Sequence, residues 1–104
     1  MKTLVLGDGR SVPKRGNTVI VHYTGKLEDG TRLDSSRDRN EAFEFILGAG
    51  QVIRGWEEAL AQMSKGQLVQ ITLSPEYGYG QAGFPPSIPG NTVLIFEIEL
   101  IDFK

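Results

Sequence analysis

The sequence predicts an α+β protein in which an antiparallel sheet packs against one short helix. Several segments alternate apolar and polar side chains with a period of two, which is typical of half-buried strands. One segment carries apolar residues at helical spacing. Because the strand segments outnumber the helical one and do not alternate with it, an antiparallel sheet is favoured over a parallel sheet.

Three segments carry the clearest strand patterns. Residues 91–103 turn two glutamates to one face and four apolar side chains to the other, namely Leu94, Phe96, Ile98 and Leu100. Residues 67–74 alternate polar side chains with Val69, Ile71 and Leu73. Residues 17–27 are rich in β-branched and aromatic residues, which favour strands. Residues 42–48 and, more weakly, residues 3–6 are further strand candidates.

The helical pattern lies in RGWEEALAQMSKG, residues 54–66. Its apolar side chains fall at i, i+3, i+4 and i+7 and form one stripe: Trp56, Ala59, Leu60 and Met63. Glu57 and Glu58 suit the positive end of the helix dipole, and Gly66 is the expected stop. We therefore expect one short helix, packed on the inner face of the sheet.

Composition excludes several classes of function. The 104 residues match one domain, 1–104, and the net charge of −2 gives no electrostatic footprint for nucleic acid. There is no cysteine, which fits a reducing compartment, and no apolar run approaches the roughly 18 residues of a membrane span. The first residues lack the features of a signal peptide. We expect a soluble, cytoplasmic monomer without nucleic-acid or membrane partners.

The usual catalytic constellations are poorly represented. Gly78, Gly80 and Gly83 match G-x-G-x-x-G, but the prolines that follow would break the helix a pyrophosphate site requires. His22 is the one histidine and lies in a strand pattern, without carboxylates at ligand spacing. Glu97 and Glu99 fit the outer face of a half-buried sheet. We expect no metal, no cofactor and no acid–base or nucleophilic chemistry.

Aromatic residues instead occur where elements begin and end. Tyr23, Phe43, Trp56 and Tyr79 take such positions, the last in the loop YGYGQAGFPPSIPG, residues 77–90. Two interpretations stay open: a core built of large rings, or rings that converge on an apolar pocket with tyrosine hydroxyls and Asp34 as its polar groups. Taken alone, Asp34 fits a turn or capping residue just before SSRDRNE, residues 35–41, whose alternating charges are typical of a solvated loop.

Three long motifs, VHYTGKLEDGTRLDSSRDRN, QVIRGWEEALAQM and LSPEYGYGQAGFPPSIP, resemble the FKBP family of macrolide-binding immunophilins. The resemblance covers roughly residues 3–104 and is closest to the small single-domain cytosolic member. It implies a five- or six-stranded antiparallel sheet wrapped around one short helix. The implied activity is peptidyl-prolyl cis-trans isomerisation, with proline-containing peptides and protein clients as substrates, and tacrolimus and rapamycin as ligands.

The resemblance also implies a set of site residues. Five would be catalytic: Tyr23, Asp34, Trp56, Tyr79 and Phe96. Five more would bind substrate or macrolide: Leu33, Phe43, Val52, Ile53 and Ile88. Trp56 would form the floor under the pyrrolidine ring, Asp34 and Tyr79 would supply side-chain hydrogen bonds, and the backbone N–H of Ile53 would bind a ligand carbonyl.

Three positions depart from the small cytosolic member. Leu33 replaces a phenylalanine of the pocket, while Phe84 and Ser87 replace a histidine and an isoleucine in the loop. These changes bear on substrate preference and partners rather than on the fold. An enzyme that acts in protein folding is the first hypothesis. The alternative is a non-catalytic module whose pocket docks a client or, with drug bound, a second protein.

Overall fold

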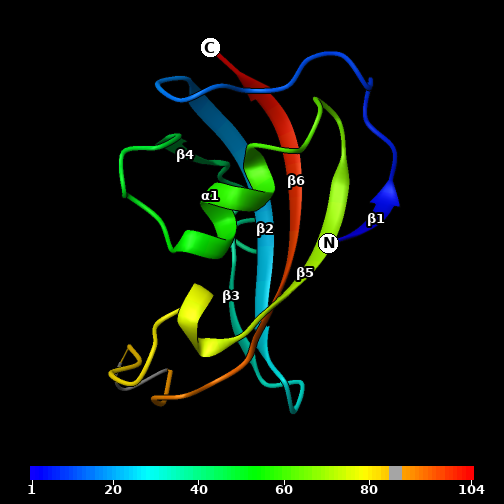
Figure 1. Ribbon diagram of the computed structural model, residues 1–104. Helices are drawn as coiled ribbons and strands as arrows, with labels where there is room; N and C mark the ends of the chain where they lie inside the picture. Colours follow the sequence, from blue (N-terminus) through cyan, green and yellow to red (C-terminus); the bar gives the residue numbers. More distant parts are fainter. Residues whose placement is uncertain (85–87) are drawn as a thin grey trace.

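Six strands form one antiparallel sheet, and the helix α1 lies across one of its faces (Figure 1). The computed structural model describes residues 1–84 and 88–104. Within these ranges the elements follow in the order β1 (Lys2–Val5), β2 (Thr18–Leu27), β3 (Arg32–Ser35), β4 (Phe43–Ile46), α1 (Arg54–Leu60), β5 (Leu68–Leu73), a 3₁₀ turn (Pro75–Tyr77) and β6 (Leu94–Phe103). None of the helices among these residues is long and apolar enough to cross a membrane.

The strand order is β1-β5-β6-β2-β3, and β4 pairs with the first half of β2. The long strands β2 and β6 run side by side from the pair Val19–Phe103 to the pair Leu27–Leu94. On the side of β2 away from β6, β4 pairs with the first half of β2 and β3 with its second half (Figure 1). The expected α+β architecture is confirmed.

The core lies between α1 and the sheet. The predicted inner face of β6 is confirmed, since Leu94, Ile98 and Leu100 have no exposed surface and Phe96 has little. Val69 of β5 is equally buried. From the other side, α1 contributes Trp56, Ala59 and Leu60. The apolar periodicity of the sequence therefore identified the packed layers correctly.

The predicted extent of the helix was wrong, because α1 ends at Leu60 rather than before Gly66. The amides of Gln62 and Met63 bond three residues back, as in a tight final turn. Gly66 then donates to the carbonyl of Leu100 in the sheet. These bonds to other elements replace the helical ones, although Met63 still reaches the core at its predicted spacing.

Strand β3 was not predicted, and its presence changes the interpretation of Asp34. Residues 32–35 pair with β2, with Asp34 opposite Gly25, so this aspartate lies in a strand and not in a turn. The following segment is also less solvated than expected, since Ser35 and Ser36 are buried. Four residues are too few to show a period of two, which explains why the pattern gave no signal.

Candidate functional site

A cavity of about 380 Å³ opens between α1, the sheet and the loop after the 3₁₀ turn. All ten residues that the sequence predicted for the site line this cavity: Tyr23, Leu33, Asp34, Phe43, Val52, Ile53, Trp56, Tyr79, Ile88 and Phe96. Gln51 and Phe84 line it as well, although neither was predicted as a pocket residue. The volume and the apolar lining are typical of a small-molecule or peptide site.

Trp56 forms the floor of the cavity. Its indole is buried, and rings from three strands stand steeply against it. The centroid distances are 5.0 Å to Tyr23, 5.4 Å to Phe96 and 6.1 Å to Phe43, with interplanar angles of 72°, 87° and 80°. Such edge-to-face contacts stabilise the rings in fixed orientations. The cavity therefore has a flat aromatic base with aromatic walls.

Two glycines make room for close packing around the cavity. A Cβ on Gly25 of β2 would lie 2.6 Å from Cε1 of Phe96, and a Cβ on Gly55 would lie 2.3 Å from a methyl group of Leu73. Both distances are far below contact, so a side chain at either position would displace a neighbour. Gly55 lets the start of α1 sit close against β5, which brings the next residue, Trp56, under the cavity.

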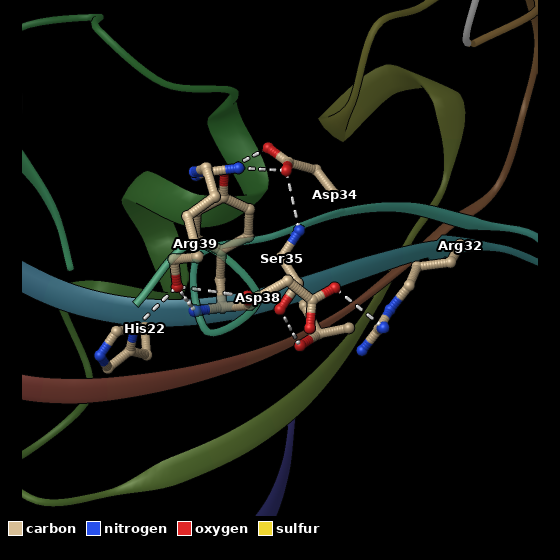
Figure 2. A network of polar contacts seen from close by, with 9 residues as sticks. His22, Arg32, Asp34, Ser35, Asp38 and Arg39 are labelled. Atoms are coloured by element: carbon tan, nitrogen blue, oxygen red, sulfur yellow. Dashed lines mark hydrogen bonds and ion pairs between the residues drawn. The ribbon is translucent and has the colours of Figure 1, made fainter. Parts of the chain in front are cut away.

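A polar network borders the cavity at Asp34 (Figure 2). The hydroxyl of Tyr23 donates to Oδ2 of Asp34 over 2.6 Å, and the backbone N–H of Ser35 donates to Oδ1 over 2.8 Å. Arg39 forms an ion pair with Oδ1 and donates to the Tyr23 hydroxyl oxygen over 3.1 Å. Both carboxylate oxygens thus accept bonds from the chain itself, and Asp34 fixes the ring of Tyr23.

Sequence reasoning missed Arg39. The residue stands in a segment of alternating charges, which is the usual pattern of a solvated loop, and nothing in its spacing points to the cavity. It reaches Asp34 because the chain turns directly after β3, where the Arg39 N–H donates to the Ser36 carbonyl and Asn40 adopts a positive φ of 51°. Only tertiary structure reveals this contact.

The buried hydroxyl of Ser36 supports the same wall from behind. It accepts a 2.8 Å bond from the backbone N–H of Tyr23 and lies 2.9 Å from Nδ1 of His22 (Figure 2). The Ser36 N–H donates in return to the Tyr23 carbonyl. These bonds hold the backbone of Tyr23, while Asp34 and Arg39 hold its hydroxyl. His22 contacts this support and is not among the residues that line the cavity.

The ionisable groups around the cavity keep one charge state near neutral pH. Burial acts to raise the pKa of Asp34, but hydrogen bonds from Tyr23, Arg39 and Ser35 outweigh it and hold the pKa below its ordinary value. Burial raises the pKa of Tyr79, and burial together with the bond to Asp34 raises the pKa of Tyr23. The lining therefore contains a carboxylate and two neutral phenols, and none of these groups is set up to exchange protons at pH 7.

Tyr79, Phe84 and Ile88, which are described residues of the loop, form the remaining wall. Tyr79 and Ile88 both line the cavity, as expected, and the rings of Tyr79 and Phe84 lie 5.4 Å apart. Ser87, where the sequence departs from the small cytosolic immunophilin, lies outside the described residues. In the described part of the chain, no three His, Cys, Asp or Glu side chains lie close enough together to hold a metal ion.

The fold and the cavity together define a small α+β protein with a largely apolar cavity between its helix and its sheet. Residues 9–101 match the family described as FKBP-type peptidyl-prolyl cis-trans isomerase. The chain belongs to this family.

Individual relatives are similar over nearly the whole chain. The peptidyl-prolyl cis-trans isomerase FKBP1A of Xenopus laevis is 54% identical over 97% of this chain and 94% of its own length. The FK506-binding protein 1A of Aspergillus fumigatus is 55% identical, over 91% of this chain and 85% of that protein. The peptidyl-prolyl cis-trans isomerase Fkbp12 of Drosophila melanogaster is also 55% identical, over 91% and 88%. The family and the enzyme class that the motifs indicated are confirmed.

Proposed function

We propose that the chain catalyses cis-trans isomerisation of Xaa-Pro bonds in this cavity, and that the same cavity binds macrolides of the tacrolimus and rapamycin type. The observation that carries the proposal is the arrangement of three rings around the buried indole of Trp56. A flat apolar floor with steep aromatic walls suits a pyrrolidine ring. The Aspergillus relative is an FK506-binding protein, which supports the macrolide part of the proposal.

The reaction itself needs no proton transfer. Rotation about the Xaa-Pro bond has a barrier of roughly 18–20 kcal/mol because the twisted amide loses its resonance. Water stabilises the planar, charge-separated amide more than the twisted one. Aromatic walls that withhold water from the amide carbonyl therefore raise the ground state relative to the transition state.

Exclusion of water accounts for only part of the acceleration. Burying an amide without its hydrogen-bond partners costs roughly 1–3 kcal/mol, which corresponds to about one to two decades of rate. The remainder has to come from holding the substrate in a turn-like, partly twisted conformation. The shape and rigidity of the walls then matter as much as their polarity. The network of Tyr23, Asp34 and Arg39 contributes by keeping the Tyr23 ring in a fixed orientation.

In this mechanism each lining residue acts by position. Trp56 supports the proline ring, while Tyr23, Phe43 and Phe96 exclude water around it. The Tyr79 hydroxyl and the Ile53 N–H belong to residues that line the cavity, and they serve as donors to substrate carbonyls. Asp34 keeps the Tyr23 ring in place. Leu33, Val52 and Ile88 complete the apolar lining.

The proposal also predicts the substrates, the cellular location and the oligomeric state of the protein. Substrates are proline-containing peptides and protein clients, and the protein acts as a cytoplasmic monomer. The activity is tested by two-dimensional NMR exchange spectroscopy on a Leu-Pro tetrapeptide with catalytic amounts of protein. We expect cis-trans exchange well above the uncatalysed rate. A folded protein that leaves the exchange rate unchanged would reject the proposal.

A further inference from the structure

Phe84 is an exposed part of the cavity wall. Its side chain is 60% exposed, and among the described residues it is the one large apolar side chain that is both exposed and part of the cavity lining. Other exposed apolar residues, such as Leu6 with 83% exposure, are not part of this lining. An apolar ring left in solvent at the mouth of a binding site indicates a contact surface.

The ring of Phe84 lies beside the aromatic box rather than inside it. Within the described residues it pairs with Tyr79, at 5.4 Å and 46°, and not with the Trp56 floor that Tyr23, Phe43 and Phe96 contact. A proline ring on Trp56 would thus not rest on Phe84. The group that meets Phe84 is a neighbour of the proline in the bound chain.

Two backbone hydrogen bonds hold the main chain at Phe84 against Ile88. The N–H of Phe84 donates to the Ile88 carbonyl over 2.8 Å, and the Ile88 N–H donates to the Phe84 carbonyl over 2.9 Å. Ile88 is anchored in the core with 7% exposure, and the Gly83 N–H donates to the Tyr79 carbonyl. Because these bonds fix the main chain at Phe84, a ligand that contacts the ring has to order only its side chain.

On the basis of the proposed function, we propose that Phe84 selects Xaa-Pro substrates that carry an aromatic side chain in the residue next to the proline. In the proposed function the Tyr79 hydroxyl donates to a carbonyl close to the proline, and the structure places the Tyr79 ring 5.4 Å from that of Phe84. A side chain attached near that carbonyl therefore meets the open face of Phe84. An aromatic side chain gains there from ring–ring contact in addition to burial of its apolar surface.

The test compares peptides that differ only beside the proline. The kcat/KM values of Ala-Phe-Pro-Ala and Ala-Ala-Pro-Phe are each divided by that of Ala-Ala-Pro-Ala. We expect at least one ratio to fall by about three- to ten-fold in Phe84→Ala, mainly through KM. The ratios stay at the wild-type values in Phe84→Tyr and in the matched exposed control Leu6→Ala.

Dissociation constants for the same peptides, read from the chemical shift of the Trp56 indole N–H, separate this inference from the proposed function. If no peptide isomerises faster but the affinity ratio depends on Phe84, the isomerase proposal fails and the selection by Phe84 stands. Unchanged ratios in Phe84→Ala, by rate and by affinity, would overturn the selection while leaving the enzyme intact. If Phe84→Leu keeps the wild-type ratios, the requirement for an aromatic side chain at position 84 is overturned.

Discussion

The hydroxyl of Tyr23 donates a 2.6 Å hydrogen bond to Asp34, and this bond ties an aromatic wall on β2 to the neighbouring strand β3. Arg39 bonds to both residues from the turn that follows. The bond between Tyr23 and Asp34 therefore couples the orientation of the Tyr23 ring to the solvent-accessible ion pair of Asp34 and Arg39. A residue that resembles a surface aspartate in the sequence has a structural role in the site.

Asp34→Val tests this coupling. The substitution removes the acceptor of the Tyr23 hydroxyl and leaves Arg39 without its carboxylate, so the ring loses its fixed orientation. We expect kcat/KM on a Leu-Pro peptide to fall roughly five- to ten-fold, with a stability change of about 1 kcal/mol. Asp38→Val, which breaks the exposed pair with Arg32, is the matched control and should keep full activity. Equal activities of the two variants would show that the bond between Asp34 and Tyr23 has no role in catalysis.

Trp56 is the second test, because the proposal makes its indole the floor. Trp56→Ala should weaken rapamycin binding strongly but also destabilise the fold by about 3–5 kcal/mol, since it empties a buried site. Trp56→Phe retains an aromatic floor with less area. Calorimetric titration should show its affinity for rapamycin reduced about ten-fold, from roughly 1–2 kcal/mol of lost apolar contact. Wild-type affinity in a folded Trp56→Phe would reject the indole as the floor.

The pH profile of the reaction follows from the charge states of the lining. The pKa of Asp34 is lowered and those of Tyr23 and Tyr79 are raised, so all three keep their state between about pH 5 and pH 9. We expect kcat/KM to be flat across this range. His22→Gln serves as the control, because the histidine contacts Ser36 rather than the cavity. A bell-shaped profile centred near pH 7 that persists in this variant would contradict a mechanism without proton transfer.

At low pH, Asp34 also affects the stability of the fold. The pKa of Asp34 is lower in the folded than in the unfolded chain, so its contribution is present above the unfolded value of about 4 and is lost as the pH falls through the folded value. Thermal unfolding of the wild type and of Asp34→Asn should therefore give melting temperatures that converge as the pH falls below the lowered pKa of folded Asp34. A difference that stays constant through this fall in pH would mean that the charge of Asp34 does not stabilise the fold.

Gly25 gives a test of how the walls are packed. A Cβ there would meet the ring of Phe96 at 2.6 Å, so Gly25→Ala should destabilise the protein by roughly 1–3 kcal/mol through overpacking. In the double variant with Phe96→Leu the clashing ring atoms are gone. Chemical denaturation should then give a smaller loss than the sum of the two single changes. Strict additivity would show that the two positions do not constrain each other.

The sequence predicted the sheet and the core well, because long strands with one buried face leave a clear period of two. The inner faces of β5 and β6 are examples. It predicted less where tertiary bonds decide the local structure. The bond from Gly66 to Leu100 diverts the chain after Leu60, and pairing with β2 makes a strand of the four residues around Asp34. The rings of the site were identified through motif resemblance, whereas Arg39 and Gln51 reach it only through the folded chain.

The most direct test of the central claim is competition between catalysis and macrolide in one sample. Cis-trans exchange of a Leu-Pro tetrapeptide is recorded by NMR with catalytic protein, and rapamycin is then added up to one equivalent of protein. We predict that the acceleration disappears in proportion to the drug bound, because both ligands occupy the cavity above Trp56. Acceleration that persists with rapamycin bound would contradict a shared cavity and place the catalysis elsewhere on the molecule.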